Sequence, residues 1–330
     1  MGNALLTDDL ELFCSPRAAP NLSVEEVEWH DADAHCVVVG DCSRVTARCS
    51  LWWRSTPRYR NQPVGVIGHY DAYTADAAAA LLATAGRRLA EQGCSFAVGP
   101  MDGNTWRRYR LISERGPEPI FFLEPAHPNA SAAHFMENGF AAMATYFSSL
   151  SPDLDQHDPK AAQAGARLRE EGIRIRSLDQ GSFVDELRRI HSLSLASFKD
   201  NFLYTPIGEA EFLAMYLPLQ PYIDPRLILI AEHNGSPVGF MVGIPDLLRA
   251  RAGRPVDTVI LKTLAVHPDY GGLGIGRALI SACQETARRL GYGRAISALI
   301  REDNTSAKLV PPGSYRIRRY TLFGKELTPS

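Results

Sequence analysis

The sequence predicts a mixed α/β fold of two similar domains in tandem, each a central mixed β-sheet flanked by helices. Three observations support this prediction. A chain of 330 residues is longer than one hydrophobic core usually organises, so two domains are expected. Residues 259–290 read as an apolar strand, a glycine loop and an amphipathic helix. Both halves of the chain also carry the order strand, strand, strand, helix, strand.

The N-terminal half begins with a predicted β-hairpin, in which Gly40 and Asp41 join two runs of β-branched and apolar residues. Residues 75–92 are rich in alanine and leucine and predict a helix, which ends at the C-cap residue Gly93. The expected strands of this half lie at residues 35–39, 45–53, 64–67, 96–98 and 120–123.

The C-terminal half is organised around a strand at residues 257–266, which ends there because Pro268 cannot donate a ladder hydrogen bond. After the glycines, apolar side chains recur at helical spacing, so the following helix should bury one face. Asn234 and Gly235 predict a hairpin. The other expected elements are strands at 173–178, 227–232, 237–243 and 294–300 and helices at 183–198 and 209–216.

A stretch rich in proline and aspartate separates the two halves. Such stretches are typical of linkers, because they favour turns and resist burial. We therefore expect a first domain at residues 1–155, a linker at 156–172 and a second domain at 173–330.

Two segments indicate that the domains are copies of one another. Residues 93–104 and 293–304 both begin with glycine, carry a short strand and end with an asparagine that precedes threonine. This similarity predicts an internal duplication. Where the second copy has its glycines, the first has Asp71 and Asp76, whose charges would repel phosphate. The first copy is therefore expected to be degenerate and to lack a phosphate loop.

The glycine loop at residues 271–276 is the feature most closely tied to function. A loop that opens a helix directs several backbone N–H groups and the positive end of the helix dipole at one place, which suits a phosphate. A Walker A loop would need Lys and Ser or Thr at Arg277 and Ala278, and a dinucleotide fingerprint would need glycine at Arg277 or Leu279. Both alternatives fail, so nucleotide hydrolysis is not expected.

The stretch resembles the acyl-CoA loop of the GNAT superfamily of N-acetyltransferases, in which an apolar strand and Val-x-Pro precede Gln/Arg-x-x-Gly-x-Gly/Ala at the start of a helix. Val266, Pro268, Gly274 and Gly276 match this pattern, whereas Gly271 stands where the family usually has Gln or Arg. The resemblance covers residues 173–327 and implies acetyl-CoA or another acyl-CoA as cofactor. It assigns to the cofactor Leu264, Ala265, Val266, Gly271, Gly272, Leu273, Gly274, Ile275, Gly276, Arg277 and Asn304.

The resemblance implies an N-acyltransferase, which moves an acetyl group from acetyl-CoA to an amine by direct attack in a ternary complex. The backbone N–H of Val266 is the implied oxyanion donor. The family's tyrosine acid would fall at Pro311, where a helix cannot continue, so the last helix should end near Leu309. Tyr315 is then the expected acid, and Tyr320 is the second candidate. The carboxylates expected near the cleft are Asp257, Glu302 and Asp303, and none stands out as the base.

Composition argues against several classes of protein. With 35 basic and 37 acidic residues the net charge is −2, which argues against a nucleic-acid or membrane partner. Residues 1–10 lack the pattern of a signal peptide, so a cytoplasmic protein is expected. The six cysteines form no C-x-x-C pair, so we expect free thiols, most of them buried, and no metal site.

The acceptor is not specified by the sequence. A small-molecule amine and a protein lysine both fit the implied chemistry, because one fold serves many acceptors. A homodimer is left open. Gly271 and Pro311 also support a second hypothesis, in which the chain is a non-catalytic acyl-CoA-binding or regulatory protein.

Overall fold

The computed structural model describes residues 4–15, 22–41, 44–156 and 158–328. In the N-terminal half the predicted helix at 75–92 is confirmed as α3 (Ala75–Glu91). The other helices there are α1 (Leu10–Cys14), α2 (Val24–Trp29) and α4 (Ser131–Glu137). The strands are β1 (Ala4–Thr7), β2 (Ala34–Val39), β3 (Val45–Trp52), β4 (Arg58–Tyr59), β5 (Gln62–Ala72), β6 (Phe96–Gly99), β7 (Leu111–Arg115) and β8 (Ala141–Ser151).

The C-terminal half contains every strand and helix that the sequence predicts for it. Its helices are α5 (Pro159–Glu170), α6 (Phe183–Phe198), α7 (Glu209–Tyr216), α8 (Leu247–Arg251) and α9 (Ile275–Arg289). Short 3₁₀ turns are η2 (Gln180–Ser182), η3 (Leu217–Tyr222), η4 (Pro225–Leu227), η5 (Pro268–Tyr270) and η6 (Thr305–Leu309). The strands are β9 (Ile173–Ser177), β10 (Ile228–His233), β11 (Ser236–Pro245), β12 (Thr258–Val266), β13 (Arg294–Arg301) and β14 (Tyr315–Glu326).

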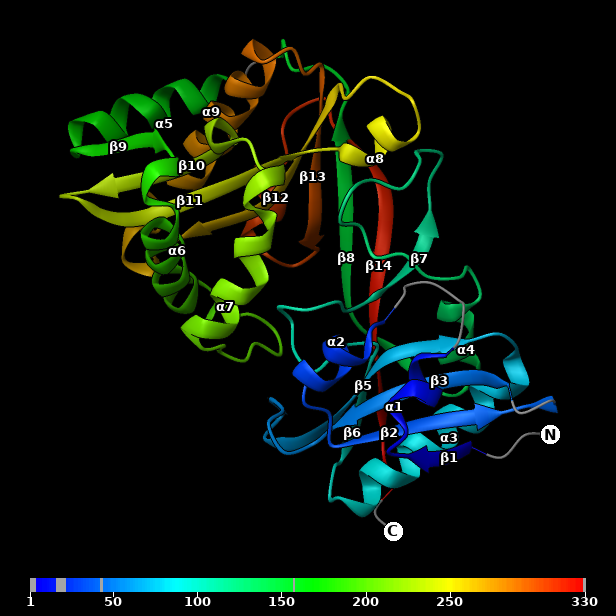
Figure 1. Ribbon diagram of the computed structural model, residues 1–330. Coiled ribbons are helices and arrows are strands. Elements are labelled where there is room, and N and C mark those ends of the chain that lie inside the picture. The colour runs from blue at the N-terminus through cyan, green and yellow to red at the C-terminus, as the bar shows by residue number, and fades with distance from the viewer. Residues whose placement is uncertain (1–3, 16–21, 42–43, 157, 329–330) are drawn as a thin grey trace.

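A single mixed sheet runs through both halves, in the order β1-β2-β3-β5-β6-β14-β8-β13-β12-β11-β10-β9 (Figure 1). The pairs β5–β6 and β12–β13 are parallel, and their neighbours along this path are antiparallel. Because a parallel pair needs a crossover, each is connected by a helix, α3 in the first half and α9 in the second. The two halves are therefore copies of one arrangement.

The two halves exchange their last strands. Strand β14, from the end of the chain, lies between β6 and β8, and β8 lies between β14 and β13. Each half thus completes its sheet with a strand of the other. The division at residues 155 and 173 stays a prediction, although β14 joins the sheet of the first half and α5 of the expected linker packs on α9.

The expected strand at residues 120–123 is wrong. This segment makes a turn, in which the Glu124 N–H donates to the Phe121 carbonyl at 3.1 Å and Leu123 has a φ of +62°. The place beside β6 that a further strand could take is filled by β14. Phe121 instead packs with Ile260, Leu150 and Ile317 at the contact between the halves, where apolar burial holds the turn.

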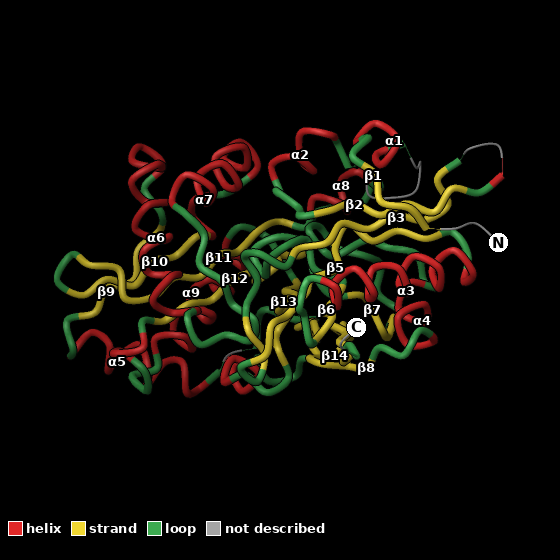
Figure 2. Tube along the Cα trace, turned by 90° about the horizontal axis from the view of Figure 1, so that it is seen from below, coloured by secondary structure: helices red, strands yellow, loops and turns green. Residues whose placement is uncertain are grey.

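Helices cover both faces of the sheet (Figure 2). In the C-terminal half α6 and α7 lie on one face and α9 and α5 on the other, as the separate apolar clusters on the two sides confirm. Within the described residues no helix is long and apolar enough to cross a membrane. Cys36, Cys49, Cys94 and Cys283 are buried free thiols, Cys14 is partly exposed, and Cys42 lies outside the described residues.

Candidate functional site

The glycine loop leaves the start of α9 without a side-chain cap. The N-cap residue is Gly274, whose φ of +89° lies in the left-handed region that glycine favours. At the matching place in the first half, the Thr74 hydroxyl accepts a hydrogen bond from the Ala77 N–H at 3.2 Å and so caps α3. Of these two helices, α9 alone combines a glycine loop with backbone N–H groups that no N-cap side chain occupies, which is the arrangement that binds anions.

Close packing restricts two of these glycines. A Cβ on Gly274 would lie 2.9 Å from the Cβ of Ala164 in α5, and one on Gly276 would lie 3.1 Å from Leu309 in η6. Arg277, expected at the cofactor, forms an ion pair with Asp158, the residue that caps α5. Helix α5, in the expected linker, therefore packs against the glycine loop.

Strands β12 and β13 part beside this loop. Their parallel pairing runs from Thr258 with Arg294 to Leu261 with Ser297 and stops there, although both strands continue. The His267 N–H donates to the Val238 carbonyl on β11 at 2.9 Å. Since successive N–H groups of a strand point to opposite edges, the Val266 N–H points toward β13, across the gap. The structure thus brings Leu264, Ala265 and Val266 together with residues 271–277.

Both strands bulge where the gap opens. Leu261 pairs with Gly243 and Thr263 with Val242, so Lys262 is the extra residue of β12. On β13, Leu299 has a φ of +59°. Its N–H donates to the Ser148 hydroxyl at 3.1 Å, so β8 of the first half helps to hold the bulge.

The predicted tyrosines do not lie at the gap. The last helical segment is the short 3₁₀ turn η6, which ends at Leu309 as expected, but Tyr315 opens β14, which β8 and β13 separate from β12. Three strand spacings correspond to about 14 Å. The Tyr315 hydroxyl donates to Glu118 at 3.2 Å, and Tyr320 is fully buried with its hydroxyl on Glu124. Burial and Glu124 raise the pKa of Tyr320.

The carboxylates and Asn304 also have partners. Asp257 pairs with Arg249 at 2.9 Å, Glu302 with Arg316 at 2.8 Å and Asp303 with Arg301 at 2.6 Å. The side chain of Asn304 caps η6 by accepting from the Ser306 N–H at 3.4 Å. Because η6 packs against α9, Asn304 lies on a turn next to the loop.

In the first half the equivalent gap is closed. The segment after β6 folds back on β5: the Met101 N–H donates to the Ile67 carbonyl at 2.8 Å. Asp102 accepts from the His69 N–H at 2.6 Å. A Cβ on Gly68 would lie 2.1 Å from the Met101 carbonyl oxygen, so this contact requires glycine. Backbone hydrogen bonds therefore join β5 to the segment after β6 at the place where β12 and β13 part in the second half, which agrees with a degenerate first copy.

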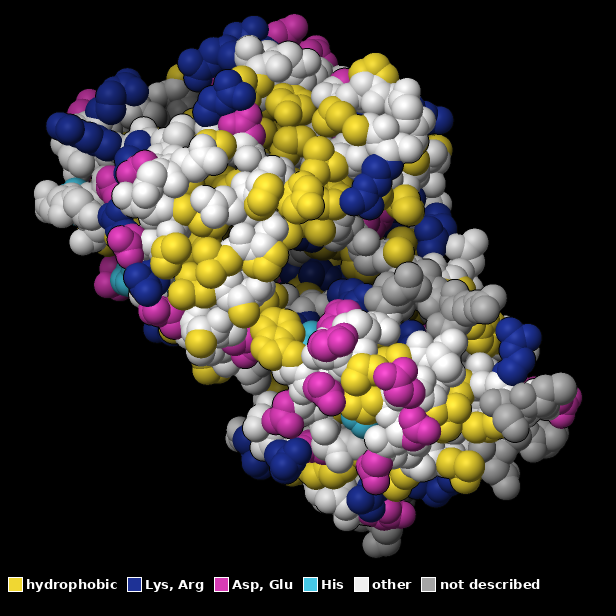
Figure 3. All heavy atoms as spheres, in the orientation of Figure 1, with side chains coloured by type: hydrophobic (Ala, Val, Ile, Leu, Met, Phe, Trp, Pro, Cys, Tyr) yellow, Lys and Arg dark blue, Asp and Glu magenta, His cyan; other side chains and the backbone are white. Residues whose placement is uncertain are grey.

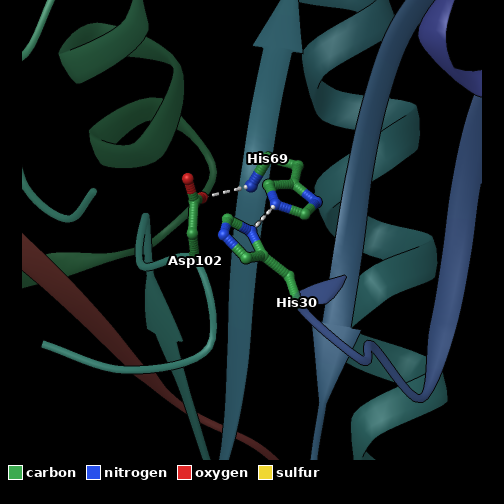
Figure 4. Close-up of side chains that lie close together, drawn as sticks. All are labelled: His30, His69 and Asp102. Atoms are coloured by element: carbon green, nitrogen blue, oxygen red, sulfur yellow. Dashed lines mark hydrogen bonds between the residues drawn. The ribbon is translucent and has the colours of Figure 1, made fainter. Parts of the chain in front are cut away.

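Sequence reasoning missed a buried cluster of His30, His69 and Asp102 (Figure 4). The His30 Nδ1 and His69 Nε2 atoms are 2.7 Å apart, and Asp102 also accepts from Arg108. Burial, with Arg107 and the neighbouring histidine, lowers the pKa of His30 to about 3. The nearby arginines disfavour a bound cation. No sequence signal could have revealed the cluster, because its members come from separate elements.

Comparisons with known proteins agree with this geometry. The model of the acetyltransferase (GNAT) family matches residues 189–310. An acetyltransferase of Yersinia pestis is 38% identical over 105 residues, 32% of this chain and 67% of the relative. A bacterial ceramide synthase of Caulobacter vibrioides is 24% identical over 264 residues, 72% of this chain and 69% of the relative.

The fold also matches a solved structure along almost its whole length. A GCN5-related N-acetyltransferase from Sphaerobacter thermophilus superposes with a TM-score of 0.53 at 16% identity, covering 99% of this chain and 96% of that one. A mixed sheet flanked by helices, in which an uncapped glycine loop lies beside two parallel strands that separate, defines an acyltransferase fold. The chain belongs to the GNAT acetyltransferase family.

Proposed function

We propose that this protein is an N-acyltransferase that moves an acetyl or longer acyl group from an acyl-CoA to an amine by direct attack in a ternary complex. One observation carries the proposal: the uncapped start of α9 and the Val266 N–H face the same gap between β12 and β13. A diphosphate and a thioester arm need these two features side by side.

The residues of this chain then have separate tasks. The backbone N–H groups of residues 271–276 hold the diphosphate, and Leu264 and Val266 pair with the amide groups of the pantetheine arm as a further strand would. When bound, the thioester supplies an activated acyl group. A backbone N–H of β12 near Val266 stabilises the negative charge that develops on the carbonyl oxygen during attack.

Release of the thiol does not require a tyrosine. A thiol with a pKa of about 8.5 leaves readily as thiolate, so an enzyme of this family can work without a strong acid. The position of Tyr315 gives no support to its role as proton donor, which stays a sequence-based proposal.

The acceptor is an amine, on a small molecule or on a protein lysine. Hydrophobic side chains gather on the face that carries α6, α7 and α8, above a recess between the halves that holds Lys or Arg side chains (Figure 3). Met215, Leu217 and Ile223 are partly buried against the apolar cluster under α6 and α7, and Tyr222 in η3 is exposed. Since a ceramide is an acylated long-chain amino alcohol, the ceramide synthase relative adds such amines to those worth testing.

The decisive experiment combines binding and turnover. Calorimetry with acetyl-CoA measures binding, and a thiol reagent measures release of free CoA when a simple amine, a lysine peptide or a long-chain amino alcohol is added. An enzyme binds acetyl-CoA and releases thiol only with an acceptor. Binding without release by any acceptor would favour the alternative, a non-catalytic acyl-CoA-binding protein. Absence of binding to acetyl-CoA and to a long-chain acyl-CoA would refute both.

A further inference from the structure

Lys262 occupies the point on β12 where the gap opens. It follows Leu261, the last residue paired with β13, and it is the bulge residue that opposes no residue of β11. A bulge re-aims the side chain of its extra residue, and such bulges are frequent beside active sites. Lys262 lies two positions, about 7 Å, along β12 from the predicted cofactor contact at Leu264.

The side chain of Lys262 points to the face opposite α9. Val259 and Leu261 pack in the cluster under α9, whereas Ile260 packs against Phe121 on the other face. The Lys262 Nζ atom donates to the Leu123 carbonyl at 3.2 Å, on this second face. An acceptor that enters from the recess between the halves would meet this face first.

The surroundings of Lys262 favour its neutral form. Burial lowers the pKa of its amine to about 7, the charge of Arg110 lowers it further, and Glu124 acts in the opposite direction. Glu124 is itself bound to Arg318 and Tyr320, so it does not pair with the lysine. A neutral amine at physiological pH can accept a proton.

A proton acceptor is needed at this place. A free alkyl amine with a pKa of about 10.4 is protonated at neutral pH, and an amine that attacks a carbonyl must lose a proton. Asp257, Glu302 and Asp303, the carboxylates expected near the cleft, are paired with arginines. Lys262 lies where pairing between β12 and β13 ends, and its Nζ atom donates to the Leu123 carbonyl rather than to a carboxylate.

We propose that Lys262 is the general base of the acyl transfer, an inference that rests on the proposed function. As the acceptor nitrogen forms its bond to the acyl carbon, the carbon–sulfur bond breaks and its electron pair goes to sulfur. The proton of the attacking nitrogen moves to the Lys262 Nζ atom, and from there to water. No further reactant is required.

The test compares Lys262→Gln and Lys262→Arg with the matched control Lys325→Gln. Lys325 is a partly buried lysine whose Nζ atom also donates to a backbone carbonyl, that of Asn138 at 2.9 Å. It lies near the end of β14, where this strand pairs with β6 in the sheet of the first half. Both Lys262 variants should lose about 100-fold in kcat/KM, as expected for loss of a general base. Their affinity for acetyl-CoA in calorimetry should stay within about threefold of the parent protein, because the groups that hold it are unchanged.

The two variants separate catalysis from structure. If Lys262 only supported the bulge by its charge and length, Lys262→Arg would restore the rate. The kcat/KM of the parent protein, plotted against pH, should rise with a midpoint near pH 7. This rise should be missing in Lys262→Gln. A Lys262→Gln rate equal to that of the parent near neutral pH would overturn the proposal.

A second readout does not depend on turnover. Acetic anhydride acylates neutral amines, so labelling of the free protein across a pH series, followed by mass spectrometry, measures the titration of each lysine. Lys262 should label with a midpoint near pH 7, well before a reference lysine peptide with a pKa of about 10.4. If Lys262 were labelled at the same pH as the reference peptide, its assignment as the general base would be contradicted. Acyl transfer from acetyl-CoA to Lys262 itself would contradict the assignment as well. If the parent protein fails to bind acetyl-CoA or to release thiol, the proposed function fails instead.

Discussion

The Arg110 guanidinium, in the first half of the chain, donates from Nη1 to the carbonyl oxygen of Leu299 on β13 at 3.3 Å. Leu299 is the left-handed residue of the bulge that separates β13 from β12. Arg110 is held between the rings of Tyr109 and Tyr146, with its guanidinium carbon 3.8 and 4.2 Å from their centres. The degenerate half thus helps to keep open the gap in the other half.

Replacement of Arg110 should therefore weaken binding at a site in the other domain. We expect Arg110→Met to reduce acetyl-CoA affinity about tenfold, because loss of one charged hydrogen bond of about 1.5 kcal/mol lets the bulge relax. Calorimetry checks this, with Arg87→Met on the exposed face of α3 as control. Unchanged affinity would mean that Ser148 and strand pairing hold the bulge alone. The midpoint of Lys262 labelling should also rise, since Arg110 lowers that pKa.

Gly274→Ala should abolish tight binding of acetyl-CoA. The left-handed φ of +89° costs an alanine about 1 kcal/mol, and its Cβ would meet Ala164 at 2.9 Å and distort the loop. Gly291→Ala is the matched control, because Gly291 has a φ of +93° and nothing within 4 Å of a Cβ. Urea unfolding should show both variants destabilised, while calorimetry should show a loss of affinity of at least about tenfold for Gly274→Ala alone.

Tyr315→Phe should change kcat by less than about threefold, since a surface hydroxyl away from the chemistry contributes little. The Tyr315 side chain is 45% exposed and its hydroxyl is bound to Glu118. Steady-state thiol release measures the effect. A drop of about 100-fold with unchanged KM would instead support Tyr315 as the acid and require β14 to move.

The buried ion pair between Glu124 and Arg318 should contribute to holding the two halves together. Their side chains are 1% and 2% exposed, and the distance is 2.8 Å. Removing one partner leaves a buried charge unpaired, so Glu124→Ala should lower the free energy of unfolding by about 3–5 kcal/mol in urea titrations. Glu91→Ala breaks the exposed pair with Arg88 and should cost at most about 1 kcal/mol. If both variants lowered the free energy of unfolding equally, the buried pair would not contribute to holding the two halves together.

Acid should destabilise the first half through His30. Its pKa is about 3 in the folded protein against an ordinary 6.5, so the unfolded chain binds more protons between these values. The free energy of unfolding should therefore fall as pH decreases below 6.5 and stop changing from this source below about 3. Urea titrations at a series of pH values should show a weaker dependence for His30→Gln. An identical slope would show that His30 is already protonated in the folded state.

Local patterns were sufficient to predict much of this protein. Hydrophobic periodicity located α3, α6 and α9 and the paired strands, because one-sided burial imposes a repeat on the sequence of each element. The glycine loop could also be predicted, since a left-handed N-cap and close helix contacts at Gly274 and Gly276 exclude other residues.

Only the tertiary structure decided how these elements share a sheet. The exchange of β8 and β14 pairs residues far apart in the chain, such as Arg319 with Phe147, and no local periodicity records which strand is its neighbour. The same pairing moved Tyr315 away from β12, made residues 120–123 a turn in which Phe121 is buried, and set the bulge at Lys262. These features depend on non-local hydrogen bonding and packing, which a sequence read residue by residue does not encode.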